Sequence, residues 1–271
     1  MIQMKHQIKM IVSDLDGTLL RSDKSISEPT KAVLQKCRES GIKVVYATGR
    51  GGNAECRAPS HLFDGRIIMN GAVARINDTI IYKRLIPYQT ARPLLMACDA
   101  YGLKAASEVS DMHYSNFVVS DVWSTVTNFK IVDFSKHDVD AEKLYMLIRE
   151  QNGAALDTAL IEKHLGGELY LTVSKDGLAQ VMHKDATKSK AIAVLARSWN
   201  IDHSEIAAFG DDLNDSDMLE YAGIGVAMEN ARDEVKALAD STCPGNNEDG
   251  VAEWIRKNIL RSAASFSEGN P

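Results

Sequence analysis

The chain has little cysteine and no long apolar run. Its 271 residues include only four cysteines, which lie far apart without a C-x-x-C pair, so we expect reduced thiols rather than a disulfide scaffold. The seven histidines form no H-E-x-x-H pair, which argues against a zinc enzyme. No apolar run approaches the roughly 20 residues of a membrane span. With an N-terminal apolar stretch too short for a secretory signal, the sequence predicts a cytoplasmic protein that does not bind membranes.

Basic residues are also few relative to acidic ones. Lysine and arginine total 31 against 37 aspartates and glutamates, which gives a formal net charge of −6. Without basic blocks, nucleic acid is not expected as a partner, and any anionic ligand must meet local positive charge. The hydrophobic fraction of 45% and charged fraction of 25% are typical of globular proteins and exclude disorder and collagen. The length favours two domains, or one domain carrying an insertion.

The first 86 residues are expected to alternate between strand and helix. Short apolar runs without alternation, typical of strands buried on both faces of a parallel sheet, lie at residues 8–12, 42–47 and 66–69. Between the first two runs, Ser27 is a predicted helix N-cap and Gly41 stands where that helix should end.

The pattern changes over residues 87–185. Helices are expected at residues 90–101 and 139–151. Strands are expected at residues 117–119, 168–174 and 178–182. Lys175-Asp176-Gly177 separates the last two strands and is a hairpin signal. This segment is therefore predicted to form a separate α+β module.

Strand and helix alternate again over residues 186–260. The expected helices lie at residues 188–198, 215–222, 231–239 and 251–260, and the expected strands at residues 206–209 and 224–228. The small, polar residues 261–271 are predicted to form a flexible tail. The predicted fold class is α/β, with a Rossmann-like parallel-sheet core from residues 1–86 and 186–260 and an inserted α+β domain from residues 87–185.

Three polar clusters directly follow predicted core strands. They are Asp14-Leu15-Asp16-Gly17-Thr18, Thr48-Gly49-Arg50 and Gly210-Asp211-Asp212-Leu213-Asn214-Asp215. In an open parallel sheet, ligands bind beyond the carboxyl ends of the strands. We therefore expect these clusters, although distant in sequence, to meet in space.

Their convergence would gather four carboxylates, those of Asp14, Asp16, Asp211 and Asp215, around one cation, Lys188. Two like charges about 4 Å apart repel by roughly 4 kcal/mol at an effective dielectric constant of 20, so the cluster requires a divalent cation. Oxygen ligands without histidine or cysteine favour a hard ion, and Mg2+ is the first choice. One carboxylate could then attack a phosphoryl group to form an aspartyl phosphate. Another, two residues on, could protonate the leaving oxygen and activate water.

The residues beside these carboxylates suit an anionic ligand. Thr48 offers a hydroxyl group and Gly49 an unobstructed backbone N–H. Lys188, at a predicted helix start, adds positive charge where the helix dipole already favours anions. Each fragment alone could be an ordinary turn or surface feature, but their joint occurrence in this order points to phosphoryl transfer.

The same segments resemble the motifs of the haloacid dehalogenase-like phosphatases. Residues 14–20 (DLDGTLL) resemble the first motif, residues 47–50 the second, and residues 210–215 the fourth. Further segments similar to the Cof-type branch of that family lie at residues 69–72 (MNGA), 225–231 (GVAMENA) and 247–252 (NEDGVA).

This resemblance implies roles for the acidic residues. Asp14 would be the nucleophile and a Mg2+ ligand, and Asp16 would be the general acid/base, with its backbone carbonyl on the metal. Asp211 would bind Mg2+ directly, with Asp215 as a ligand or a support. Asp212 could either join the metal shell or face water.

The resemblance also implies a phosphate site. The residues expected to hold the phosphate are Leu15 (through its backbone), Thr48, Gly49, Lys188 and Asn214. One segment departs from the family pattern: where the family usually has Gly-Val-Ser-Lys-Gly, this chain has Asp185-Ala186-Thr187-Lys188-Ser189-Lys190. Lys190 therefore competes with Lys188, which we prefer, for the lysine role.

By the same resemblance, residues 87–185 would be a cap domain that sets substrate specificity. Its polar and aromatic candidates are His113, Tyr114, Asn116, Trp123 and His183. The expected substrate is a small phosphorylated metabolite, such as a sugar phosphate or a phosphorylated cofactor, and the expected assembly is a monomer or a weak homodimer.

Two alternatives to a phosphatase are considered. A phosphomutase on the same fold should carry an arginine cluster in the cap, but residues 87–185 contain only Arg92 and Arg149, which disfavours it. A non-enzymatic phosphoacceptor or metal-binding regulatory domain would be shorter, would lack a cap, and would not need a second carboxylate at the position of Asp16.

Overall fold

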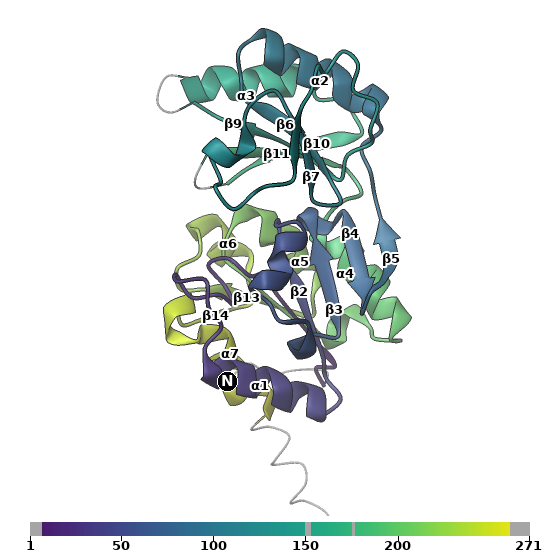
Figure 1. Cartoon of the computed structure of the whole chain (residues 1–271). Coiled ribbons are helices and arrows are strands. Elements are labelled where there is room, and N and C mark those ends of the chain that lie inside the picture. Colours follow the sequence, from purple (N-terminus) through teal and green to yellow (C-terminus); the bar gives the residue numbers. More distant parts are fainter. Residues whose placement is uncertain (1–6, 150–152, 175–176, 261–271) are drawn as a thin grey trace, which may run out of the picture. The chain divides into compact units, whose positions relative to one another are not determined.

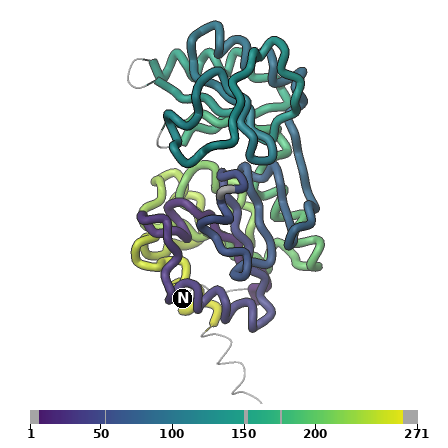
Figure 2. Tube along the Cα trace, viewed as in Figure 1, coloured from purple at the N-terminus to yellow at the C-terminus, as the bar shows by residue number. Residues whose placement is uncertain are grey.

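The computed structural model describes residues 7–149, 153–174 and 177–260, and the chain divides into two compact units. The first unit, here called the core, combines Met1–Tyr82 with Thr187–Pro271, and the second, here called the cap, is Lys83–Ala186. Figure 2 shows the purple first part and the yellow last part of the chain together in the core, while the teal middle part forms the cap. No described helix combines the length and the apolar character needed to cross a membrane.

The described part of the core contains an eight-stranded sheet in the order β14-β13-β12-β1-β2-β3-β4-β5 (Figure 1). Neighbours from β14 to β3 are parallel, and β4 runs antiparallel to β3. The strands are β1 (Met10–Ser13), β2 (Lys43–Ala47), β3 (Gly65–Ile68), β4 (Val73–Ile76), β5 (Thr79–Lys83), β12 (Ile206–Gly210), β13 (Ile224–Met228) and β14 (Ser241–Cys243).

Helices cover both faces of this sheet. On one face lies α4, because a Cβ atom at Gly65 of β3 would stand 3.2 Å from Leu195 Cδ2. On the other face lies α7, where the rings of Phe209 and Trp254 meet edge to face with 5.3 Å between centroids. The core helices are α1 (Glu28–Glu39), α4 (Lys188–Ser198), α5 (Ser216–Tyr221), α6 (Asp233–Leu238) and α7 (Gly250–Ile255).

The three central strands place the polar clusters together at their carboxyl ends. Strand β1 is fully buried and pairs in parallel with β12 on one side and β2 on the other. The register sets Ser13 opposite both Phe209 and Tyr46, so the three strands end at the same level. The backbone N–H of Asp14 continues the ladder, donating to the Phe209 carbonyl oxygen at 2.9 Å.

The described part of the cap contains a six-stranded sheet with helices packed on one side. Its strand order is β10-β11-β9-β6-β7-β8, antiparallel except for the parallel pair β7–β8. An apolar cluster joins Leu94 and Leu95 of α2 to Leu144 and Met146 of β9. The cap elements are α2 (Tyr88–Ala100), β6 (Ala105–Val109), β7 (Met112–Ser115), β8 (Phe129–Ile131), β9 (Lys143–Leu147), α3 (Ala154–Lys163), β10 (Leu169–Val173) and β11 (Leu178–His183).

The predicted fold class, a Rossmann-like parallel-sheet core with an α+β insertion, is confirmed. The helix predicted at residues 188–198 coincides with α4. Ser27 caps α1 as expected, because its side chain accepts a hydrogen bond from the Thr30 backbone N–H at 3.1 Å. The expected insertion ran from residue 87 to 185, and the cap spans Lys83–Ala186.

Two predictions within the cap are wrong. Where a helix was expected at residues 139–151, the structure has the strand β9, buried between β11 and β6, and positions 150 and 151 lie outside the described residues. No strand forms at residues 117–119, where one was expected; a short 3-10 helix, Val119–Asp121, begins at the last of these residues. Strands β10 and β11 do pair in antiparallel fashion, but positions 175 and 176 of the predicted turn, like the tail 261–271, lie outside the described residues.

Candidate active site

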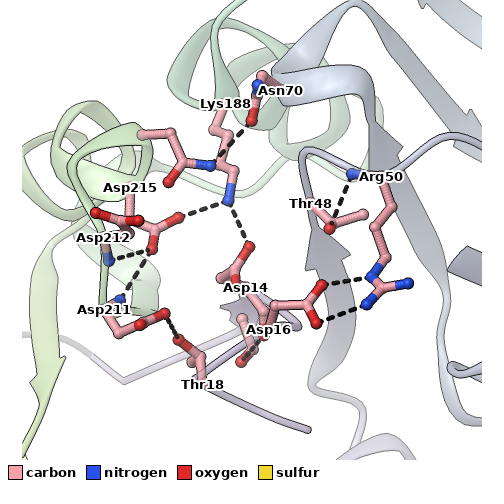
Figure 3. A network of polar contacts seen from close by, with 12 residues as sticks. Asp14, Asp16, Thr18, Thr48, Arg50, Asn70, Lys188, Asp211, Asp212 and Asp215 are labelled. Carbon is pink, nitrogen blue, oxygen red and sulfur yellow. Dashed lines mark hydrogen bonds and ion pairs between the residues drawn. The ribbon is translucent and has the colours of Figure 1, made fainter. Parts of the chain in front are cut away.

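Three carboxylates meet at the carboxyl edge of the core sheet. Asp14 follows β1, Asp211 follows β12, and Asp215 ends the short helix Leu213–Asp215. One carboxylate oxygen from each lies within 4.8 Å of the others, and all three residues are buried (Figure 3). The structure thus brings together three of the four predicted carboxylates, which we call the acidic cluster.

Lys188 supplies the positive charge of this cluster. Its Nζ atom donates to Asp14 Oδ1 at 2.7 Å and to Asp215 Oδ1 at 2.5 Å, and the residue is 1% exposed. Lys188 is the first residue of α4, whose start is fixed by the N-cap Thr187. Lys190 lies on the same helix but is exposed, so of the two candidate lysines it is Lys188 that contacts the acidic cluster.

The loop after β12 is shaped around Asp215. While Oδ1 of this residue faces Lys188, Oδ2 accepts hydrogen bonds from the backbone N–H groups of Asp211 at 2.9 Å and Asp212 at 3.1 Å. A Cβ atom at Gly210 would stand 2.5 Å from Asp215 Cβ, so only glycine leaves room for this arrangement. Asp215 therefore organises the loop as well as facing the cluster.

The turn after β1 holds the Asp211 carboxylate. Gly17 has φ +80°, which glycine adopts without strain, and a Cβ atom there would lie 2.4 Å from Asp211 Oδ2. The neighbouring Thr18 hydroxyl donates to Asp211 Oδ1 at 2.9 Å. The D-x-D-G-T sequence thus lets the first strand end contact the distant strand end after β12.

Asp16 has a separate environment, and its carboxylate lies outside the acidic cluster (Figure 3). Arg50 holds both oxygens, with Nη2 donating to Oδ1 at 2.7 Å and Nε donating to Oδ2. Lys24 Nζ also donates to Oδ1 at 2.7 Å. The two carboxylates of the D-x-D sequence therefore pair with different cations.

The surroundings of Asp14 and Asp16 shift the pKa values of the two residues in opposite directions. Burial raises the pKa of Asp14 well above its usual range; the Lys188 charge opposes this effect, and the charges of Asp215 and Asp211 add to it. Burial acts against the charged form of Lys188 too, but the carboxylates of Asp14 and Asp215 outweigh it and raise the pKa of the lysine, which stays protonated. Burial also opposes ionisation of Asp16, yet hydrogen bonds from Arg50 and Lys24 prevail and lower its pKa.

The predicted phosphate-binding residues lie at the same carboxyl end of the core sheet. Thr48 is 1% exposed and its hydroxyl oxygen accepts from the Arg50 backbone N–H at 3.2 Å. The Leu15 side chain is fully buried in the core, which leaves its backbone as the polar part. The Asn214 side chain donates through Nδ2 to Asn70 Oδ1 at 3.0 Å. Gly49 lies against this Asn70 amide.

Asp212 lies beside the acidic cluster without joining it. Its Oδ1 atom forms an ion pair with Arg232 Nε at 2.6 Å and accepts the Leu213 backbone N–H at 2.8 Å. Among the described residues, the set of carboxylates close enough to share a metal ion does not include it.

The candidate residues of the cap engage other cap residues. His113 Nδ1 lies 2.9 Å from the Tyr145 hydroxyl, and Asn116 Nδ2 donates to Asp99 Oδ1 at 2.9 Å. The remaining candidates form ring contacts or weak ion pairs, namely Tyr114 with His137, Trp123 with Tyr145, and His183 with Glu168.

Sequence reasoning gave no role to three residues of this site. Arg50 and Asn70 stand inside segments that it had singled out, but their partners Asp16 and Asn214 are distant in sequence. Lys24 carried no signal, because a lysine in a polar loop is ordinarily a surface residue.

Comparison with known proteins places the chain in a family. The profile of the haloacid dehalogenase-like hydrolases matches residues 11–255. The 5-amino-6-(5-phospho-D-ribitylamino)uracil phosphatase YitU of Bacillus subtilis is 26% identical over 265 residues, which cover 92% of this chain and 96% of that protein. The phosphatase YwpJ of Bacillus subtilis is 28% identical over 290 residues, covering 92% and 99%.

Solved structures agree with these relatives. The phosphatase BT1666 from Bacteroides thetaiotaomicron superposes with a TM-score of 0.81 at 26% identity, covering 95% of this chain and 97% of that one. The subclass IIB sugar phosphatase BT4131 gives a TM-score of 0.79 at 26% identity, covering 92% and 98%.

The chain therefore belongs to the haloacid dehalogenase-like hydrolase family, which confirms the resemblance of its motifs. The prediction of an enzyme of the phosphatase class is confirmed as well.

Proposed function

We propose that this protein is a Mg2+-dependent phosphatase that hydrolyses small phosphorylated metabolites through an aspartyl phosphate on Asp14. The observation that carries the proposal is the meeting of Asp14 with Asp211, Asp215 and Lys188 at the carboxyl ends of β1 and β12. A buried carboxylate beside a lysine and two further carboxylates can be screened by a metal and can approach an anionic phosphoryl group.

The acidic cluster fits a hard divalent cation. Three carboxylates of the described residues lie together in a buried place, and Lys188 pairs with two of them, Asp14 and Asp215, so a divalent cation would offset the negative charge gathered there. All donors are oxygens, as Mg2+ prefers. Asp14 and Asp211 would hold the ion through their carboxylates and Asp16 through its backbone carbonyl, with Asp215 as a ligand or a support. When bound, Mg2+ would supply charge that keeps Asp14 ionised and polarises the phosphoryl oxygens.

In the first step, an Asp14 oxygen would attack phosphorus and the bond to the leaving oxygen would break. Asp16 is the proposed acid that gives this oxygen its proton, for which its carboxyl group must leave Arg50 and Lys24 and take up a proton. In the second step, ionised Asp16 would remove a proton from the water that attacks the aspartyl phosphate. Inorganic phosphate and the free Asp14 carboxylate would then be restored.

Removing the metal provides the first test. We expect release of phosphate from a generic aryl phosphate such as para-nitrophenyl phosphate to stop when the protein is treated with a chelator and to return when Mg2+ is added in excess. The control is the same titration monitored by thermal unfolding, in which Mg2+ should raise the melting temperature because the ion binds the folded cluster. Turnover that continues in excess chelator would contradict the metal role.

The phosphate site is proposed to comprise the Leu15 backbone, Thr48, Gly49, Lys188 and Asn214. Replacing Lys188 and Lys190 in turn tests which of these two lysines binds the phosphate. We expect Lys188→Ala to raise the KM for phosphate esters by roughly tenfold to a hundredfold, because charge-assisted hydrogen bonds contribute about 1.5–3 kcal/mol. Lys190→Ala, on the same helix but exposed, is the matched control and should leave the KM near its parent value. The reverse order of effects, in folded variants, would assign the role to Lys190.

We propose that the cap selects the substrate and that the substrates are sugar phosphates or phosphorylated cofactors. The names of similar proteins support this range, since one relative acts on a phosphorylated ribitylaminouracil and one structural neighbour on sugar phosphates. Screening a panel of phosphorylated metabolites by phosphate release would identify the preferred member.

A phosphomutase is not favoured by the cap. The cap has three arginines, of which Arg84 lies before residue 87; the other two are engaged within the cap, Arg92 with the His137 carbonyl oxygen at 2.7 Å and Arg149 with Asp157. Neither forms part of an arginine cluster that could hold a second phosphate group.

A further inference from the structure

The segment Met69–Gly71 has no role in the chemistry above, yet its backbone is unusual. Three consecutive residues have positive φ, with 52° at Met69, 51° at Asn70 and 103° at Gly71. Such angles are strained for methionine, tolerable for asparagine and ordinary for glycine. A strained turn persists only where surrounding contacts hold it, and strained turns gather at functional sites.

The turn contacts segments that carry residues of the proposed phosphate site. The Met69 backbone N–H donates to the Arg50 carbonyl oxygen at 2.9 Å, and that of Asn70 donates to the Thr48 carbonyl oxygen at 3.0 Å. A Cβ atom at Gly71 would lie 2.2 Å from the Thr187 carbonyl oxygen, immediately before Lys188. The turn therefore joins the segment that carries Thr48 to the helix start that carries Lys188.

The Asn70 side chain adds the third part of the site. It is 2% exposed, and its Oδ1 atom accepts a hydrogen bond from Asn214 Nδ2 at 3.0 Å (Figure 3). A Cβ atom at Gly49 would stand 2.9 Å from the same Oδ1 atom, so glycine at this position makes room for the Asn70 amide. Asn70 thus contacts Gly49 and Asn214 together.

The chemistry of a carboxamide explains why this contact matters. An asparagine side chain can turn by half a rotation and exchange its donor NH2 group for its acceptor oxygen. An anion needs the donor, whereas the acceptor oxygen would repel it. In this pair Asn70 Oδ1 accepts and Asn214 Nδ2 donates, so Nδ2 of Asn214 keeps a second hydrogen for another acceptor.

We propose that Asn70 is a positioning residue of the phosphate site, which orients the Asn214 carboxamide so that it offers a donor, not an acceptor, to the bound phosphate. This inference rests on the proposed function, since it assumes that Asn214 contacts phosphate. Asn70 acts through its hydrogen bond with Asn214, and its amide occupies the space that the missing side chain of Gly49 leaves.

The first variant is Asn70→Gly, which keeps a residue that accepts positive φ but removes the amide. We expect the KM for para-nitrophenyl phosphate and the inhibition constant of inorganic phosphate to rise together by roughly tenfold, the size of one lost hydrogen bond to a charged ligand. The kcat should change much less, because the orientation of Asn214 serves binding in the ground state and transition state alike. The matched control is Asn77→Gly, since Asn77 has φ 52° but is exposed in the turn between β4 and β5.

The second variant is Asn70→Asp, which is nearly isosteric and keeps an acceptor for Asn214. Its added negative charge next to the phosphate site weakens phosphate binding, so we expect both constants to exceed their parent values. Because a side chain that only packed there would bring the same charge, this variant tests whether Asn70 lies beside the bound phosphate, and parent-like constants would overturn the inference. This variant keeps the inference testable if Asn70→Gly fails to fold.

A double-variant cycle then tests whether Asn70 works through Asn214. We expect Asn70→Gly combined with Asn214→Ala to bind inorganic phosphate no more weakly than Asn214→Ala alone. Additive losses, or parent-like phosphate inhibition in both Asn70 variants, would overturn the inference. The proposed function would survive that result provided that Asp14→Asn still abolishes turnover, so the two failures are distinguishable.

Discussion

Asp14→Asn is expected to lower turnover of any phosphate ester by about a thousandfold or more, since loss of a covalent nucleophile has effects of this order or larger. The amide keeps the shape of the carboxylate but lacks its charge and cannot form the acyl phosphate. The fold should survive, because Asn Oδ1 can still accept from Lys188 and the backbone N–H of residue 14 still binds the Phe209 carbonyl oxygen. The measurement is steady-state phosphate release, with thermal unfolding as a check of folding.

The matched control for this variant is Asp212→Asn. Asp212 lies beside the acidic cluster, but its carboxylate pairs with Arg232 and caps the following turn. We expect its loss to change turnover by at most a few-fold. Equal activity of Asp14→Asn and the parent enzyme would refute the nucleophile assignment, and a collapse in Asp212→Asn would show that the metal site extends further than the cluster described above.

Asp16→Asn is expected to slow turnover by about a hundredfold to ten-thousandfold, the usual contribution of a positioned acid or base. Metal binding should remain near its parent strength, because the Asp16 side chain lies outside the acidic cluster and its backbone carbonyl is unchanged. The loss should be greatest for substrates with poor leaving groups, which need a proton most. The measurement is kcat across a series of aryl and alkyl phosphates, with Mg2+ affinity followed by thermal shift.

Two results would count against this role for Asp16. Unchanged turnover would remove the acid/base assignment. A matching loss of Mg2+ affinity would instead mean that the Asp16 side chain supports the metal ion. Its carboxylate would then have to leave Arg50 and Lys24 when the metal binds.

Much of the core could be predicted because its signals are local. Strands β1 and β12 are short apolar runs buried on both faces, and each is followed at once by acidic turn residues. Ser27 and Thr187 mark helix starts through their own side chains. The meeting of Asp14 with Asp211 follows from one general rule about parallel sheets, so it needed no knowledge of the intervening chain.

The cap was harder to predict because its strands do not alternate. In β9, Leu144 and Met146 face the helices while Tyr145 faces the other side, and all three are buried. A strand buried on both faces loses its period of two, and the spacing of Leu144, Leu147 and Ile148 then imitates a helix. The small residues of β6 and the helix α3 gave no compensating signal.

The partners of the site residues needed the fold itself. That Arg50 binds Asp16, or that Asn70 binds Asn214, depends on which side chains share an edge of the sheet and on their orientation. Lys188 and Lys190 differ by half a turn of helix, so sequence could favour one only by analogy, whereas the buried contact with Asp14 distinguishes them by geometry.

Under the proposed function, Asp14 carries the phosphoryl group during turnover. The enzyme is quenched in acid while it hydrolyses an aryl phosphate and is then treated with borohydride. Borohydride reduces an acyl phosphate to an alcohol, and peptide mass spectrometry identifies the modified residue. We expect homoserine at position 14 in the parent enzyme and none in Asp14→Asn. Reduction at another residue, with position 14 unmodified in an enzyme that is turning over, would contradict it.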